Sequence, residues 1–354
     1  MSDIINEKLN KINRSISNIK ATYALGGNAS IEGLQGVAAP KKGFIPVEYN
    51  SSGYPSKLKV KDIGASIRDK VFSGALFNQI EEVSFEGDKI TSIGQKAFSG
   101  CSKLEKINFL NDIELSSIKS YTFSGCSLLD ISSILNENIT NIESSALSSS
   151  GTKRAYIPNV TSLGSSAFSG CSQLEEVILS DNLTTISSST FYKCKKLTDI
   201  KLPSALTSIN DSAFAVAGIK RFSIPDGVTK IPQRTFQSNS NLVQFSCNVY
   251  DIAGTGSGNG GLSYCSKLVA VWFGDKFSQT GKYESVYGNS QLTDCTNLKK
   301  IFINRPRAEV EQIPGYKYKW QYYGSYRGEV ICNDDPGFMT REEFDNFHWE
   351  NYTE

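Results

Sequence analysis

Eight cysteines are the residues of this 354-residue chain with the widest range of chemistry. Thiols at suitable spacings form disulfides, bind zinc or act as nucleophiles. No Cys-x-x-Cys pair occurs, and where most copies of a recurring pattern have cysteine, others have Ser150, Ala217 or Asn239. Because these residues cannot form a disulfide, we interpret the recurring thiols as small, buried packing groups. They are Cys101, Cys126, Cys171, Cys194, Cys265 and Cys295, whereas Cys247 and Cys332 lie outside the pattern.

The other reactive side chains show no catalytic arrangement. The one histidine, His348, lies among aromatic residues near the C-terminus, and a nucleophile system needs an imidazole that the fold positions. The glycine run at 254–261 lacks the Gly-Lys-Ser/Thr ending of a phosphate-binding loop. Acidic pairs such as Glu175 and Glu176 are adjacent in sequence and do not indicate two carboxylates across a cleft. The sequence therefore predicts a non-enzymatic protein without catalytic residues, metal or cofactor.

These residues are carried by an internal repeat. The string Lys-Ala-Phe-Ser-Gly-Cys at 96–101 recurs as Tyr-Thr-Phe-Ser-Gly-Cys at 121–126 and Ser-Ala-Phe-Ser-Gly-Cys at 166–171. In eight successive copies, spaced by 21 to 26 residues, an aliphatic residue precedes the Phe or its Leu replacement by five positions. Weaker copies are centred on Leu262 and Leu292, and the period is typical of leucine-rich repeats. The eight pairs are Ile67/Phe72, Ile93/Phe98, Ile118/Phe123, Ile142/Leu147, Leu163/Phe168, Ile186/Phe191, Ile209/Phe214 and Ile231/Phe236.

Each repeat also contains a strand. In the best copies apolar residues follow the Phe at alternating positions, as Val177 and Leu179 follow Phe168. One repeat thus combines a short turn, a coil or half-helix with the Phe, a Ser-Gly-Cys corner and a short strand. Stacking buries apolar faces that single repeats leave in water, so we predict a solenoid of about ten repeats over residues 61–304. Its core contains Phe72, Phe98, Phe123, Phe168, Phe191, Phe214 and Phe236.

The repeat pattern resembles a known family. The spacing Ile-x-x-x-x-Phe-x-x-Cys-x-x-Leu-x-x-Ile-x-Leu, with segments such as IPDGVTKIPQRTF between copies, is similar to the BspA-like leucine-rich repeat family over residues 60–304. This resemblance implies a solenoid built mostly of short β-strands and turns with short helical segments. It also allows a bacterial surface adhesin that binds host matrix or other cells.

Residues 1–25 predict an amphipathic helix. Their apolar residues are spaced by four, three, four, three and four positions, which is a heptad seam. A seam this short needs a partner to be stable, and Ile at both seam positions favours three strands over two. We interpret this coiled-coil-like helix as an oligomerisation or anchoring segment, with docking on its own solenoid as the alternative. The seam consists of Ile5, Leu9, Ile12, Ile16, Ile19 and Tyr23.

The repeats are flanked by two further segments. Residues 26–60 read as a linker followed by a β-hairpin that turns at 50–53 and shields the first repeat's edge. Residues 305–354 are aromatic-rich, and we interpret them as a C-terminal cap, with a protein or carbohydrate contact patch as the alternative. Near their end, Thr340 followed by Glu343 predicts a short capped helix. The residues of the predicted patch are Tyr316, Tyr318, Trp320, Tyr322, Tyr323 and Tyr326.

Charge and hydropathy restrict the partners. With 37 basic and 36 acidic residues the formal charge is +1, which provides no field for nucleic acid or an acidic membrane. No apolar run is long enough for a membrane span, and the first residues lack the order of a secretory signal.

The order of the elements carries a second resemblance. A heptad-like helix, a linker, a hairpin and Phe-type repeats are similar to leucine-rich repeat proteins of tailed bacteriophages. This resemblance implies a virion component of the tail, a fibre or the capsid, made in the bacterial cytoplasm without a signal peptide. Its partners would be itself, other virion proteins, or a host-surface protein or glycan. The adhesin alternative would place the protein on the bacterial cell surface.

Overall fold

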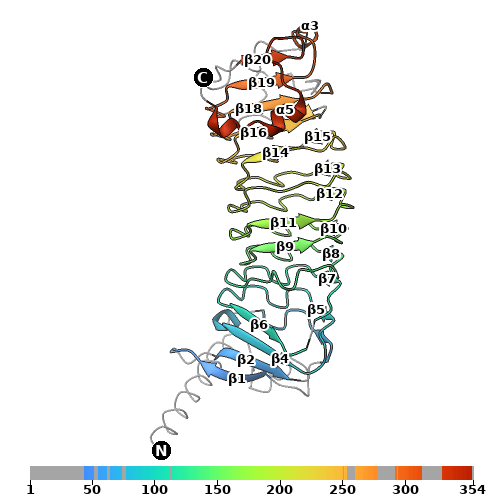
Figure 1. The fold of residues 1–354 in the computed structure, drawn as a ribbon. Helices are drawn as coiled ribbons and strands as arrows, with labels where there is room; N and C mark the ends of the chain where they lie inside the picture. The colour runs from blue at the N-terminus through green and yellow to red at the C-terminus, as the bar shows by residue number, and fades with distance from the viewer. Residues whose placement is uncertain are drawn as a thin grey trace, which may run out of the picture.

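The computed structural model is an elongated stack of coils, with β1 near one end and β20 near the other (Figure 1). The predicted heptad helix of residues 1–25 with its seam, and the predicted aromatic patch of residues 316–326, lie outside the described residues. The structure describes residues 44–51, 55–61, 64–73, 77–111, 113–249, 251–252, 260–276, 292, 294–312 and 329–352.

One column of the stack consists of two-residue strands. Each of the first eight ends in the aliphatic residue that precedes the Phe by five positions, and the strands that pair do so in parallel, as β7 does with β8. The aliphatic side chains point into the core, where Ile142 is fully buried. β-Branched side chains suit such extended, packed positions. The strands are β3 (Ser66–Ile67), β5 (Ser92–Ile93), β7 (Ser117–Ile118), β8 (Asn141–Ile142), β10 (Ser162–Leu163), β12 (Thr185–Ile186), β13 (Ser208–Ile209), β15 (Lys230–Ile231) and β17 (Asp251–Ile252).

A second column contains the longer strands, which pair in parallel within three blocks. The first block begins with an antiparallel hairpin of β1 (Phe44–Tyr49) and β2 (Pro55–Lys61). Side chains alternate between the core and an outward face, because successive strand residues point to opposite sides. The blocks are β1, β2, β4 (Glu82–Glu86) and β6 (Lys106–Phe109); β9 (Arg154–Ile157) and β11 (Glu176–Leu179); and β14 (Arg221–Ser223), β16 (Gln244–Cys247), β18 (Ala270–Phe273), β19 (Lys300–Ile303) and β20 (Glu329–Cys332).

The segment that carries each Phe is a turn. Residues in the left-handed region flank the ring two positions before and two after it, and at Phe98 these are Lys96 (φ 58°) and Gly100 (φ 82°). The N–H of Phe98 donates to the carbonyl of Thr122 in the next coil at 2.9 Å, and the N–H of Gly100 donates to Ser124 at 2.7 Å. Left-handed residues are incompatible with a continuous helix. Of the two predicted alternatives, the coil is therefore correct, and its backbone groups are paired between coils.

The phenylalanine rings form a column in the core. Within the runs 72–123 and 168–236, successive repeat rings are nearly parallel, with centroids 4.7 to 5.7 Å apart. Leu147 replaces the ring between the two runs and is itself fully buried. All seven rings are at most 2% exposed, so each coil is stabilised mainly by its neighbours.

The recurring cysteines are free, buried and equivalently bonded. The Sγ of Cys194, for example, donates to the carbonyl oxygen of Phe168 in the preceding coil at 3.2 Å. Asn239 occupies the same position and donates from Nδ2 to the carbonyl of Phe214 at 2.7 Å. Burial raises the pKa of the Cys171 thiol to about 11. The same bond is made by Cys101, Cys126, Cys171, Cys265 and Cys295, whereas Cys247 and Cys332 lie buried at the ends of β16 and β20.

The C-terminal part extends the stack and then covers its side. β20 pairs in parallel with β19, and residues 338–352, here called the tail, cross the outward face of the second column. The tail contains α5 (Arg341–Asn346) and the 3-10 helix η2 (Trp349–Asn351) (Figure 1). The capping box predicted at Thr340 and Glu343 is present, because each residue's side chain accepts a hydrogen bond from the other's backbone N–H. This part of the predicted C-terminal cap thus covers a lateral face.

Few other helices occur in the described residues. They are the 3-10 helix η1 (Phe77–Gln79) and α3 (Arg307–Val310). Every helix in this part of the chain is too short or too polar to cross a bilayer.

Candidate binding surface

The outward face of the long strands divides into three zones, and in the first, on β2, β4 and β6, most charged side chains form ion pairs. Lys59 Nζ lies 2.6 Å from a carboxylate oxygen of Glu86, and Lys61 Nζ lies 3.3 Å from its other oxygen. The hydrogen bond from Lys59 lowers the pKa of Glu86. Exposed pairs of this kind contribute little to stability, and Lys106 on β6 has no ion pair among the described residues.

The C-terminal zone, on β16, β18, β19 and β20, is apolar and covered by the tail. Trp272, Phe302 and Ile331 are only 2 to 6% exposed and belong to one cluster with Phe344 and Trp349. The centroid of the Phe302 ring lies 5.6 Å from that of Phe344 and 5.7 Å from that of Trp349. Aromatic contacts at these distances add to the stabilisation from area burial. The tail thus removes this apolar surface from water.

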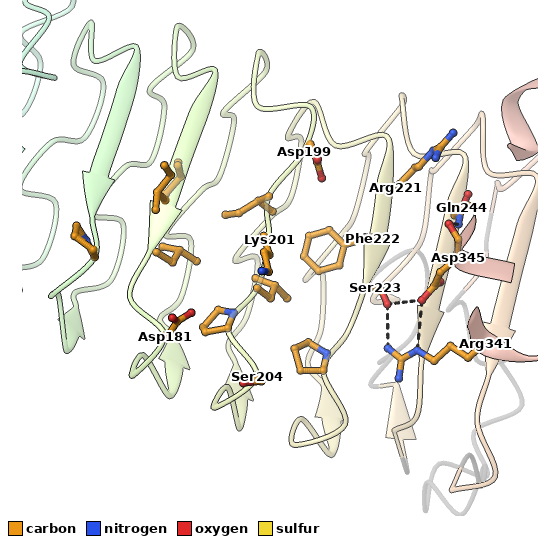
Figure 2. Close-up of a pocket in the computed structure, with 18 of the residues that line it drawn as sticks. Asp181, Asp199, Lys201, Ser204, Arg221, Phe222, Ser223, Gln244, Arg341 and Asp345 are labelled. Atoms are coloured by element: carbon orange, nitrogen blue, oxygen red, sulfur yellow. Dashed lines mark hydrogen bonds and ion pairs between the residues drawn. The ribbon is translucent and has the colours of Figure 1, made fainter. Parts of the chain in front are cut away.

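The central zone, on β9, β11, residues 199–203 and β14, is covered by the described tail only at β14. Tyr156 and Ile178 occupy paired register positions on β9 and β11, and they are 47% and 46% exposed. Beside them lies a groove of about 990 Å³ (Figure 2). Its lining includes Pro158, Asp181, Asp199, Lys201, Pro203 and Arg221.

The groove lies over a break in the strand pairing. Among the described residues, β11 pairs only with β9, β14 pairs only with β16, and no backbone hydrogen bond joins residues 199–202 to either neighbouring coil. The break between β6 and β9 differs, because side chains bridge it. The N–H of Lys153 donates to Asp130 at 3.3 Å, and the N–H of Arg154 donates to Ser132 at 2.9 Å. Residues 199–202, here called the unpaired segment, have no such bridge in the described structure.

Helix α5 of the tail forms one edge of the groove. Ser223 Oγ donates to a carboxylate oxygen of Asp345 at 2.8 Å and accepts from an Arg341 guanidinium nitrogen at 3.0 Å. The Arg341 Nε atom lies 3.6 Å from the same carboxylate. Figure 2 shows these three side chains as a linked group beside the groove. Arg341 and Asp345 are thereby fixed relative to β14.

A second polar group joins β14 to the end of the tail. Arg221 forms an ion pair with Glu350, and its Nη2 lies 2.6 Å from His348 Nδ1. A hydrogen bond from its own backbone, together with His348 and Arg221, lowers the pKa of Glu350 to about 2. The single histidine therefore has a surface contact role in the described structure.

Gln244 of β16 lies between the tail and the groove. It is 2% exposed and lines the groove, and its Nε2 donates to the carbonyl oxygens of Phe344 at 3.1 Å and Asp345 at 3.2 Å. Because both contacted atoms are acceptors, the amide nitrogen must face them and Oε1 must face away. Gln244 Oε1 is buried without a hydrogen-bond partner among the described residues.

One group away from the groove has the composition of a metal site. Ligand atoms of Cys332, Asp334 and Asp335 lie within 4.8 Å of one another. Arg307 Nε donates to Asp335 at 3.0 Å, and the Cys332 N–H donates to the same carboxylate at 2.7 Å. The Arg307 contact lowers the pKa of Asp335. These carboxylates hold α3 against β20, which gives the group a structural role.

The repeat profile decides the family. A profile of the BspA type leucine rich repeat region matches residues 65–179 and 161–284 with six copies, and these ranges span 220 of the 354 residues. The chain belongs to the BspA-type leucine-rich repeat family. A search of curated proteins found no match.

Solved structures similar to this BspA-type chain include other bacterial repeat proteins. A leucine-rich repeat protein from Bacteroides ovatus has 20% identity and a TM-score of 0.47, over 82% of this chain and 89% of that one. A leucine rich cell surface protein from Faecalibacterium prausnitzii has 19% identity and a TM-score of 0.45, over 85% and 94%. The pneumococcal vaccine antigen PcpA has 16% identity and a TM-score of 0.47, over 81% and 82%. The family assignment rests on the repeat profile.

The sequence did not predict the central zone of this BspA-type protein. The predicted core phenylalanines lie beneath the surface, and the seam and aromatic patch lie outside the described residues. Tyr156 and Ile178 are 22 residues apart and were not singled out. Their positions, nine residues after Leu147 and ten after Phe168, were the available signal, because corresponding positions in successive coils lie side by side.

Proposed function

We propose that this BspA-type protein is a non-enzymatic binding protein whose central zone contacts a partner surface. The observation that carries the proposal is the in-register pair Tyr156 and Ile178, each about half exposed beside a groove. Single exposed apolar residues are ordinary, whereas adjacent ones beside a concave surface are typical of interaction sites. The C-terminal zone is covered by the tail, and the exposed pair Ile45 and Val47 on β1, at 44% and 55%, does not line this groove.

A non-catalytic role agrees with the state of the reactive groups that the structure describes. The six recurring thiols are buried, and burial raises the pKa of Cys194 well above its ordinary value, so little nucleophilic thiolate forms at neutral pH. His348 is engaged with Arg221 and Glu350. The proposed function therefore depends on a surface. Several copies held together would bind a partner firmly even if each copy contributes only a weak contact.

The proposal further assigns the protein to a bacteriophage virion, in the tail, a fibre or the capsid. Its support is the order of sequence elements, with a predicted heptad segment, linker, hairpin and repeats resembling leucine-rich repeat proteins of tailed phages. The proposal includes self-association through residues 1–25. A chain that lacks these residues should be a folded monomer by light scattering. If it instead forms an oligomer of the same subunit number as the full chain, self-association through residues 1–25 is contradicted.

The genomic neighbourhood and the particle test the virion assignment. Flanking genes for capsid, tail or baseplate proteins, and the presence of this chain in purified particles by mass spectrometry, are expected. Flanking genes for envelope anchoring and labelling of intact bacterial cells by an antibody would instead support the bacterial surface adhesin and overturn the virion assignment.

A substitution pair tests the binding surface. Tyr156→Ala and Ile178→Asp should each reduce adsorption of the labelled protein to host cells or to purified particles by at least tenfold. Tyr121→Ala is the matched control, since Tyr121 is 40% exposed but lies in a Phe turn away from the groove. Equal adsorption by Tyr156→Ala, Ile178→Asp and wild-type protein would refute the role of the central zone.

A further inference from the structure

The groove contains a buried acceptor that the described protein does not satisfy. Gln244 Oε1 has no hydrogen-bond partner, although buried side-chain oxygens nearly always have one. The orientation of the amide is fixed by its two bonds to the tail. Gln244 lies beside Arg221 and Asp345 in Figure 2, at the edge of the groove. Because this oxygen is itself buried, it adds a polar group behind the edge of the groove and not a direct contact for a ligand.

The charges that line the groove cancel. Three acidic side chains, Asp181, Asp199 and Asp345, face three basic ones, Lys201, Arg221 and Arg341, so the formal sum is 3 − 3 = 0. Asp345 and the two arginines are engaged in ion pairs with each other or with neighbouring residues. Asp181, Asp199 and Lys201 have no ion pair among the described residues. The groove therefore offers acceptors and one ammonium to a ligand without net charge.

The apolar part of the groove suits a ligand with a flat apolar face. The Tyr156 ring and the Ile178 side chain lie beside Pro158, Pro203 and Pro225, all of which line the groove. A pyranose ring presents C–H groups on one face and hydroxyl groups around its edge. Tyr156 provides apolar area with a polar end, which matches this division. Few polar groups set among apolar ones are typical of small-ligand sites.

The unpaired segment adds backbone groups and excludes one competing ligand. The backbone of residues 199–202 is not hydrogen-bonded to neighbouring coils in the described structure, so its N–H and C=O groups lack backbone partners there. Hydroxyl groups can both donate to and accept from such groups. A peptide that adds as a strand needs a free sheet edge and about 4.8 Å of space, whereas coils lie on both sides of this segment.

We propose that this groove binds a neutral carbohydrate. Tyr156 stacks on a sugar ring, and Asp181 and Asp199 accept hydrogen bonds from its hydroxyl groups. Lys201 donates to a hydroxyl or ring oxygen. The inference deepens the proposed function, because it names the ligand class of the same central zone.

An array of immobilised neutral oligosaccharides, with acidic oligosaccharides on the same surface, tests the ligand class. Wild-type protein should bind neutral members, and Tyr156→Ala and Asp199→Asn should each raise the apparent Kd at least tenfold. The matched controls Tyr121→Ala and Asp211→Asn change an exposed tyrosine and an exposed aspartate outside the groove and should leave the Kd unchanged. No binding, binding to acidic members only, or binding that both groove variants leave unchanged would overturn the proposal.

Treatment of the partner surface separates this proposal from the proposed function. Periodate cleaves vicinal diols of glycans and should abolish adsorption of wild-type protein, whereas protease treatment should leave it. If adsorption depends on Tyr156 yet survives periodate and is lost after protease, the central zone binds protein, and the carbohydrate proposal alone fails. If adsorption does not depend on Tyr156 or Ile178, the proposed function fails whatever the array shows.

Discussion

The central and C-terminal zones present the same sheet face and differ in what covers it. In the C-terminal zone Trp272 and Phe302 are at most 4% exposed beneath the tail. In the central zone Tyr156 and Ile178 project from equivalent parallel strands and stay about half exposed. Because the coil geometry is shared, it does not decide which zone is open. Among the described residues, the tail covers the C-terminal zone and reaches the central zone only at β14, where it contacts Arg221 and Ser223.

The tail also shows what an occupant of this face needs. It brings aromatic rings to the apolar outward positions and backbone carbonyls to the Gln244 amide. It also brings charged side chains that pair at its margin, such as Glu350 with Arg221. Burial of apolar area at roughly 25 cal/mol per Å² drives such a contact, and the polar groups fix its position. The central zone offers apolar and polar groups of the same kinds without an occupant from the described chain.

The largest expected effect on stability comes from removing a side chain that holds the tail on the C-terminal zone. Trp349→Ala should lower the free energy of unfolding by about 3–5 kcal/mol, or release the tail first, because Trp349 is 2% exposed among Phe302 and Phe344. Chemical denaturation and limited proteolysis at the tail measure the two outcomes. Phe347→Ala is the control with a smaller loss, since Phe347 is 37% exposed. An unchanged unfolding curve and an unchanged protease pattern would mean that the tail does not cover this zone in solution.

The second prediction concerns the buried oxygens that lack partners among the described residues, Asn239 Oδ1 and Gln244 Oε1. It replaces Asn239. Asn239 lies in the cysteine position of its coil and is fully buried away from the groove lining. Asn239→Cys should therefore raise the stability by about 1 kcal/mol, because it removes an unsatisfied acceptor and keeps a donor for the Phe214 carbonyl. Thermal or denaturant unfolding measures the change. A loss of stability would show that the second bond of Asn239 Nδ2, to the Phe236 carbonyl at 2.8 Å, outweighs the unsatisfied oxygen.

The core could be predicted from the sequence, since one ring and one aliphatic residue per coil repeat at a nearly constant spacing. The Cys194 position was predictable for the same reason, because Ala217 and Asn239 replace it in other coils. The left-handed residues of the Phe turns were not predicted, since position two before the ring holds Lys, Tyr, Ser or Arg, none of which indicates positive φ.

The candidate site was harder to predict because it depends on contacts distant in sequence. Asp345 meets Ser223 across 122 residues, and the path of the tail over β14 and β16 follows from no local pattern. The capped helix of the tail was predictable from Thr340 and Glu343, whereas the face on which it lies was not. The break at residues 199–202 was also hidden, because Ile200 and Leu202 alternate there like strand residues.

Acid should weaken the polar contacts at the end of the tail before it weakens the apolar contacts at the centre of the tail. The pKa of Glu350 is about 2 in the folded protein and about 4.3 when unfolded, so its folded value is depressed. Its contribution is present above pH 4.3 and is lost as the pH falls toward 2. The protection of the last tail residues against hydrogen exchange, corrected for the intrinsic pH dependence of amide exchange, should therefore fall between pH 5 and pH 2. Glu350→Gln should remove most of this pH dependence, and a variant that keeps the wild-type profile would assign it to another group.

The smallest expected effect tests whether the central zone is truly open. Ile178→Thr keeps a β-branched side chain and should change the free energy of unfolding by less than about 0.5 kcal/mol, because Ile178 faces solvent. The neighbouring Val177→Thr is the matched control: Val177 is 6% exposed, and a hydroxyl placed there should cost about 1–3 kcal/mol. Denaturant unfolding of both variants measures the two changes in the free energy of unfolding. Similar losses for both variants would mean that residues outside the described ranges cover Ile178. Both zones would then be covered, and they would differ only in the segment that covers them.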